Sequence, residues 1–203
     1  MKIIGIGKNY VNDISEMPSE VTPVIFTKPD SSLLENNADL TLPAISENVW
    51  YEIELAFRIG KKGKDIKAED ALDYVDALTL ANDLTAKDVL AASREPGKGP
   101  WALAKAFDGA TPIGSFLPID QFNDVRNINF SFTVNGEERQ KGNSSLMITP
   151  LDQLIEYVSA FMTLYPGDVL LTGTPATGAD QVHSGDVMVG YLEGEKMLET
   201  KVL

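Results

Sequence analysis

Two glutamates that are two residues apart are the first feature of this sequence that could do chemistry. Glu52 and Glu54 lie in residues 50–59, where apolar and polar residues alternate. Residues i and i+2 of a strand point to the same face, so the two carboxylates are predicted to converge. Carboxylates on one face repel each other unless a cation or a proton lies between them. The pair therefore indicates either a cation site or a solvated strand face.

Asp83 and Lys105 are two further charged residues in apolar surroundings. Asp83 follows the apolar run 78–81, and the end of a strand is a common position for a ligand. It could equally cap a helix that begins near Thr85. Lys105 lies in the mostly apolar segment 101–109. There it could orient a substrate carboxylate or transfer a proton, or it could be an ordinary surface lysine.

A loop rich in threonine and glycine, residues 172–178 (TGTPATG), offers hydrogen-bond donors. Its glycines expose backbone N–H groups and its threonines add hydroxyl groups, so the loop could cradle a carboxylate. It lacks the Gly-Lys-Ser/Thr ending of a phosphate-binding P-loop. The alternative is a simple turn between two strands.

The absence of cysteine and the single histidine, His183, restrict the available chemistry. Disulfides, zinc–thiolate sites and cysteine nucleophiles are excluded, and a Ser-His-Asp triad is not expected. A metal ion in this chain should therefore have oxygen ligands. Such ligands favour a hard cation, namely Mg²⁺ or Mn²⁺, or Ca²⁺ in a crystal.

The charge balance and the apolar runs argue against nucleic acid and membranes as partners. The 203 residues carry a formal net charge of −13, without the basic stripe that a nucleic-acid binder needs. No stretch approaches the roughly 20 apolar residues of a membrane span, and the apolar run at the start is too short for a signal peptide. We therefore expect a cytoplasmic protein.

The hydrophobic pattern predicts a single mixed α/β domain over residues 1–203 that is mostly β. Helical spacing of apolar residues predicts two short helices, at residues 68–78 and 150–161. The dipeptide Asn135-Gly136 predicts a tight hairpin turn. Period-two or short apolar runs predict strands at residues 24–27, 50–59, 129–134, 169–171 and 187–192, with a last strand ending at Val202.

Eight segments, in order, resemble the fumarylacetoacetate hydrolase family over nearly the whole chain. They are residues 7–10 (GKNY), 26–29 (FTKP), 51–56 (YEIELA), 82–88 (NDLTAKD), 101–107 (WALAKAF), 134–137 (VNGE), 139–142 (RQKG) and 166–175 (PGDVLLTGTP). The resemblance implies a β-roll like the C-terminal domain of that family, with short peripheral helices, usually paired as a homodimer. It also implies that Mg²⁺ or Mn²⁺ is bound by Glu52, Glu54 and Asp83.

The same resemblance implies which other residues serve the site. Lys105 matches the family's catalytic lysine, and Thr174 and Gly173 lie in its substrate loop. Lys87 is expected to contact the substrate, but the family commonly has arginine there, and lysine cannot reproduce the two-pronged grip of arginine on a carboxylate. Leu90 stands where the family often has glutamine. Both departures bear on the identity of the substrate.

Hydrolases that the chain resembles use a His-x-x-Glu pair to activate water. The corresponding residues here are Asp13 and Glu16, so the glutamate is kept and the histidine is replaced. We expect residues 1–22 to form an N-terminal arm and a mobile lid that brings Asp13 and Glu16 over the metal. A His–Glu pair can hold one mobile proton near neutral pH, whereas two carboxylates repel each other.

The resemblance implies an enzyme that acts on a small anionic β-diketo or β-keto acid, such as an acylpyruvate or oxaloacetate. The metal would stabilise the enolate that forms when a C–C bond breaks. Hydrolysis, decarboxylation and keto–enol isomerisation stay open, and the missing histidine favours the last two. A relative that binds a metabolite without converting it is a further alternative, although the retained Glu52, Glu54, Asp83 and Lys105 argue against it.

Overall fold

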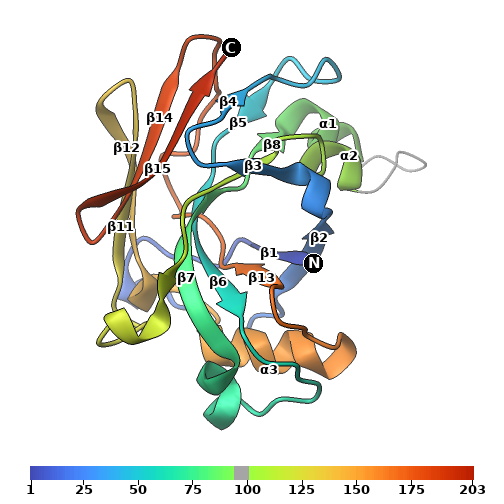
Figure 1. Cartoon of the computed structure of the whole chain (residues 1–203), viewed down its shortest axis with the longest axis vertical. Coiled ribbons are helices and arrows are strands. Elements are labelled where there is room, and N and C mark those ends of the chain that lie inside the picture. Colours follow the sequence, from blue (N-terminus) through green and yellow to red (C-terminus); the bar gives the residue numbers. More distant parts are fainter. Residues whose placement is uncertain (94–100) are drawn as a thin grey trace.

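The computed structural model describes residues 1–93 and 101–203 (Figure 1), and the mostly β arrangement that the sequence predicted is confirmed. The strands are β1 (Ile3–Gly7), β2 (Val24–Lys28), β3 (Leu33–Glu35), β4 (Asp39–Leu40), β5 (Val49–Trp50), β6 (Ile53–Ile59), β7 (Val75–Asn82), β8 (Thr85–Ala86), β9 (Thr111–Ile113), β10 (Leu117–Pro118), β11 (Asn129–Val134), β12 (Glu137–Asn143), β13 (Val169–Leu171), β14 (Val187–Leu192) and β15 (Glu195–Val202). The helices are α1 (Lys87–Ser93), α2 (Ala102–Lys105) and α3 (Leu151–Phe161), with 3₁₀ helices at Ile14–Glu16, Asp30–Ser32, Ala68–Tyr74, Ile119–Gln121 and Ser144–Leu146.

Two larger sheets carry the fold within these residues. One has the strand order β2-β1-β13-β6-β7-β9-β3, with β10 beside β7, and the other has the order β12-β11-β14-β15-β4. β6 pairs antiparallel with β7 on one side and with β13 on the other. Figure 1 shows the second sheet against β6 and β7, and α3 at one end of the first. β6 is therefore an interior strand.

Both faces of β6 are buried, although its alternating sequence predicted a half-buried strand. Ile53, Leu55 and Phe57 belong to the main hydrophobic core that the two sheets share. On the opposite face, Ala56 packs in a smaller cluster with residues of β1, β7 and β13. Glu54, also on that face, is consequently buried as well. The period of two correctly predicted which side chains share a face. It did not predict that the face carrying Glu54 is also buried.

The hairpin predicted at Asn135-Gly136 is confirmed. It joins β11 to β12, and both turn residues have positive φ angles, 54° and 81°. Positive φ at both central positions is the geometry of a type I′ turn, which Asn-Gly adopts at low cost. The register of the pair shifts between Phe132 and Thr133, which places an extra residue in β12 near Arg139.

One of the two predicted helices is confirmed, and the other is confirmed only over Ala68–Tyr74, as a 3₁₀ helix. α3 begins at Leu151 after Pro150 and buries the stripe containing Leu154, Ile155 and Val158. In contrast, residues 68–78 are divided between a 3₁₀ helix that ends at Tyr74 and the start of β7. Long-range pairing of β7 with β6 overrides the local helical spacing there.

The first strand lies inside the sheet. β1 pairs antiparallel with β2 and parallel with β13, and four of its five residues are buried. The N-terminal arm predicted over residues 1–22 therefore begins with a core strand. Across the described ranges, no helix combines the length and the apolar character that crossing a membrane requires.

Candidate metal and substrate site

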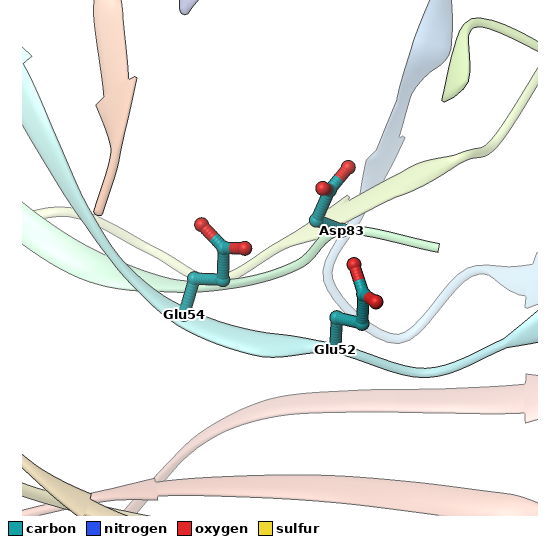
Figure 2. Close-up of side chains that lie close together, drawn as sticks. All are labelled: Glu52, Glu54 and Asp83. Atoms are coloured by element: carbon teal, nitrogen blue, oxygen red, sulfur yellow. The ribbon is translucent and has the colours of Figure 1, made fainter. Parts of the chain in front are cut away.

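The carboxylates of Glu52, Glu54 and Asp83 lie close together. One oxygen from each lies within 4.8 Å of the others, and Figure 2 shows the three side chains on the same side of their two ribbons. Glu54 is 2% exposed and Asp83 is 1% exposed. Three carboxylates in so small and buried a space repel one another unless positive charge compensates them.

Hydrogen bonds at the adjoining ends of β6 and β7 fix this arrangement. The backbone N–H of Asp83 donates to the Glu52 carbonyl at 2.8 Å. The Asn82 side chain accepts from the Glu52 N–H, also at 2.8 Å. Glu54 lies opposite Ala81 in the ladder. Asp83 is thus held beside both glutamates, and α1 begins only at Lys87.

Three lysines supply the compensating charge. The Lys105 ammonium donates to Glu52 at 2.8 Å and also contacts Asp83. Lys28 donates to the other oxygen of Asp83 at 2.6 Å. Lys87 pairs with Glu52. Lys105 and Lys28 are 5% and 2% exposed, so the alternative of a surface lysine at position 105 is excluded.

The buried charges shift one another's pKa values. Burial, and then the charge of Asp83, raises the pKa of Glu54 well above its usual range. Burial acts to raise the pKa of Asp83 too, but Lys105 and Lys28 outweigh burial and lower it. Burial acts to lower the pKa of Lys105, yet Asp83 and Glu52 raise it overall. Asp83 and Lys105 are therefore charged at neutral pH, and Glu54 is the carboxyl that binds a proton most readily.

Glu52, Glu54, Asp83 and Lys105 line a cavity of about 380 Å³. Its walls combine the charged groups with apolar side chains, which suits a small anion whose tail is apolar. Lys87 and Thr174, which the sequence resemblance placed in the substrate pocket, line the cavity, and so does Leu90. Tyr10, Phe26, Trp101 and Pro175 line the cavity as well.

Gly173 contacts a protein carboxylate. Its N–H donates to Glu54 at 2.7 Å, and its φ of 98° is one that glycine adopts readily. A Cβ at this position would lie 3.0 Å from Asn9 and 3.2 Å from the Ile6 carbonyl. The sequence assigned Gly173 to the substrate, whereas in the structure its N–H holds Glu54 in place.

Asp13 and Glu16 are not among the residues that line the cavity. Asp13 caps the start of an exposed 3₁₀ turn, Ile14–Glu16, and Glu16 is its last residue. Asp13 accepts hydrogen bonds from the side chain and the backbone of Ser15, which lower its pKa. Glu16 accepts from the backbone of Asn12 at 3.1 Å. Each carboxylate is thus bound within its own turn, and their part in a lid stays a prediction.

Lys28 is a site residue to which the sequence gave no role. Its ammonium bonds the Ala110 carbonyl at 2.7 Å as well as Asp83, and burial lowers its pKa. The only signal was its place in the Phe-Thr-Lys-Pro segment at the end of an apolar strand. Thr85, which donates to Glu52 at 3.0 Å, was missed as well.

Lys28→Met is expected to destabilise the protein by about 3–5 kcal/mol, because it removes one partner of a buried ion pair. Urea unfolding without added metal measures this loss. Lys64→Met is the matched control, since Lys64 and Asp65 form an exposed pair and such pairs contribute about 0–1 kcal/mol. Equal small losses for both variants would contradict the importance of Lys28.

Comparisons with known proteins agree with this geometry. The profile of the family described as fumarylacetoacetate (FAA) hydrolase, C-terminal, matches residues 2–203. An oxaloacetate tautomerase of Arabidopsis thaliana mitochondria is 40% identical over 195 residues, covering 95% of this chain and 86% of the relative. The mitochondrial oxaloacetate decarboxylase of Dictyostelium discoideum is 39% identical over 190 residues, 92% of this chain and 86% of that protein.

A solved structure shares the fold. The fumarylpyruvate hydrolase of Pseudomonas aeruginosa, in complex with Mn²⁺ and pyruvate, superposes with a TM-score of 0.91 at 34% identity. The match covers all of this chain and 89% of that one. The β-roll that the sequence resemblance implied is thereby confirmed.

Proposed function

Because the chain belongs to the fumarylacetoacetate hydrolase family and is one of its enzymes, we propose that it converts a small β-keto or β-diketo acid with the help of Mg²⁺ or Mn²⁺. Oxaloacetate and acylpyruvates are the leading substrates. The observation that carries the proposal is the convergence of Glu52, Glu54 and Asp83 beside Lys105 in one cavity.

The residues of the site fit a divalent cation. Glu52, Glu54 and Asp83 are hard oxygen donors, the type that Mg²⁺ and Mn²⁺ prefer. Two of them are buried and all three are bonded to N–H or O–H groups of the protein, so their positions are fixed before any ligand arrives. A cation held by these carboxylates would act as a Lewis acid toward the keto oxygen of the substrate.

The chain's own groups account for binding and orientation. Lys105 stays protonated because its pKa is raised, so its Nζ donates hydrogen bonds to a substrate oxygen that gains negative charge and does not act as a base. Thr174 offers a hydroxyl in the same cavity. Phe26, Leu90 and Trp101 exclude water from the substrate tail, which strengthens these polar contacts.

Tautomerisation or decarboxylation of oxaloacetate is the chemistry that this site supports best. Both place negative charge on the keto oxygen, which Lys105 would stabilise beside a cation held by the three carboxylates. Tautomerisation also moves one proton from carbon to a carboxylate or water and returns one to the oxygen. Hydrolysis of an acylpyruvate also needs a base that activates water. The cavity walls include no histidine among the described residues, and Asp13 stands where the resemblance leads us to expect one.

A substrate panel tests the proposal. Oxaloacetate and acetylpyruvate are supplied to the protein with Mn²⁺, with Mg²⁺ and with EDTA, and tautomerisation, CO₂ release and acetate release are measured separately. We expect metal-dependent conversion of oxaloacetate that EDTA abolishes. Tight metal-dependent binding without any turnover would identify the chain as a non-catalytic relative instead.

Asp13→His is expected to raise acylpyruvate hydrolysis and to leave oxaloacetate conversion nearly unchanged. General acid–base assistance typically contributes about 10²–10⁴-fold, and Glu16 is already present to pair with the new imidazole. Steady-state rates for the two substrates at neutral pH make the comparison. Ordinary hydrolysis by the wild type, together with no gain in the variant, would refute the argument from the missing histidine.

We also propose that the chain forms a homodimer and acts in the cytoplasm. Exposed apolar side chains, among them Phe161 and Leu103, support association because uncovered apolar patches favour contacts between copies. Light scattering at micromolar concentration is expected to report twice the chain mass. A mass near the 22.1 kDa of one chain would contradict the dimer.

A further inference from the structure

A buried glutamine joins β6, which carries Glu54, to the loop of residues 172–178, called the threonine loop below. Gln140 on β12 is 1% exposed. Its Oε1 accepts from the backbone N–H of Ile53, the residue between the two glutamates, at 3.0 Å. Its Nε2 donates to the Thr174 hydroxyl at 2.8 Å and to the Thr177 carbonyl at 3.4 Å. The sequence and the proposed mechanism give Gln140 no role.

The orientation of this amide follows from its partners. A backbone N–H can only donate and a backbone carbonyl can only accept. Ile53 therefore requires the amide oxygen on its side, and Thr177 requires the amide nitrogen on the other. The amide cannot rotate by half a turn without opposing like groups at both ends. Gln140 must consequently donate to the Thr174 oxygen.

The direction of the Thr174 hydroxyl is fixed as a result. Because its oxygen accepts from Gln140, its own hydrogen is left for another acceptor. Over residues 1–93 and 101–203, no protein group takes up that hydrogen, and Thr174 lines the cavity that holds Glu52, Glu54 and Lys105. Thr174 thus lines the cavity with its hydroxyl hydrogen available to an oxygen that accepts.

The threonine loop is also packed directly against β12. Gly178 has a φ of 87°, and a Cβ there would lie 1.9 Å from the Arg139 carbonyl, so only glycine permits this approach. On the other side of Gln140, a Cβ at Gly142 would lie 2.9 Å from Pro175. These close approaches hold the loop at the distance that the bond between Gln140 and Thr174 requires.

We propose that Gln140 is a positioning residue that sets Thr174 as a hydrogen-bond donor to an anionic oxygen of the bound keto acid. The inference rests on the proposed function, because the acceptor is the substrate carboxylate or enolate. Gln140 itself does not line the cavity and acts through Thr174. The arrangement favours ligands that present a carboxylate or enolate oxygen to Thr174 over ligands that present a hydroxyl or amine hydrogen.

A double-mutant cycle tests the coupling, with oxalate as a non-reacting probe and calorimetry on Mn²⁺-loaded protein. Thr174→Val is expected to weaken oxalate binding by about 10–100-fold, since a hydrogen bond to a charged group is lost. Gln140→Met should weaken it by a similar factor, but by less than about threefold when Thr174 is already valine. Thr174→Ser should retain binding. Independent, multiplying effects of the two substitutions would overturn the proposal.

Controls separate this inference from the function on which it rests. Thr133→Val on β11, which does not line the cavity, should leave oxalate affinity unchanged. Gln140→Glu keeps an acceptor for Ile53 and serves if Gln140→Met does not fold. The effect of Gln140→Glu on oxalate affinity should likewise be smaller when Thr174 is already valine. Metal-dependent oxalate binding by the wild type together with an additive cycle refutes the role of Gln140 alone. Absence of Mn²⁺ binding or of metal-dependent oxalate binding in the wild type refutes the function and the inference together.

Discussion

Glu54→Gln is expected to abolish Mn²⁺ binding and with it all metal-dependent turnover. Glu54 is buried beside Glu52 and Asp83, so the substitution removes one of the three charges that attract the cation. The amide can still accept from the Gly173 N–H, which bonds Glu54 in the wild type, and the local fold is retained. Mn²⁺ titration by calorimetry and oxaloacetate turnover are the measurements.

The same substitution is expected to preserve or raise stability in EDTA. The pKa of Glu54 is raised in the folded protein above its ordinary value of 4.5. The contribution of this group is therefore fully present below that pH and is lost as the pH rises through the folded pKa. Glutamine does not ionise, so the variant does not lose this stability. The melting temperature of the variant should therefore rise relative to that of the wild type as the pH increases.

An exposed glutamate provides the matched control for both measurements. Glu69→Gln changes an exposed residue on a 3₁₀ helix that does not line the cavity. It should leave Mn²⁺ binding, turnover and the pH dependence of melting as they are in the wild type. Full Mn²⁺ binding by Glu54→Gln would show that the cluster is not the metal site.

Lys105→Met should lower kcat by about 10²–10³-fold, the usual loss when one donor to a developing oxyanion is removed, while Mn²⁺ affinity is kept or increased. The ammonium bonds both Glu52 and Asp83, so its positive charge opposes a cation at the same carboxylates. The two variants thus separate metal binding from catalysis, since Glu54→Gln loses both and Lys105→Met loses only the second.

Lys67→Met is the control for the lysine, because Lys67 is exposed and its partner Glu156 lies at 3.6 Å. Steady-state kinetics at saturating Mn²⁺, with calorimetry on the same samples, distinguish the outcomes. Unchanged kcat in Lys105→Met would remove Lys105 from the mechanism. A parallel loss of Mn²⁺ affinity would mean that its role is to hold the carboxylates in place.

Local sequence patterns predicted the elements whose signals are short-range. Asn135-Gly136 determined its turn because few dipeptides adopt positive φ twice, and α3 followed from one apolar stripe. The helix prediction is wrong at residues 75–78 because Val75 and Leu78 have helical spacing, whereas β7 is buried on both faces and shows no strand alternation there. Pairing of Val75 with Ile59 decides the matter, and no local pattern records a partner that distant.

The sequence predicted the charged residues of the site, but it did not predict the buried residues that hold them in place. The two glutamates follow from alternation, since the period of two places them on one face. Their burial depends on β1 and β13, and one lysine partner, Lys28, comes from β2, all far away in sequence. Lys28 stands 55 residues from Asp83, and Gln140 stands 87 residues from Ile53. Residue types alone do not reveal such pairs.

The parallel pairing of β1 with β13 has a consequence for folding during synthesis. Ile3 is opposite Val169, so β1 has no neighbour on that edge until β13 has been made. Non-local pairing of this kind slows folding and leaves an unpaired edge exposed meanwhile. Gly173, which holds Glu54, follows two residues after β13. Metal affinity should therefore arise late in biosynthesis, and truncated nascent chains that end before residue 173 should bind no Mn²⁺.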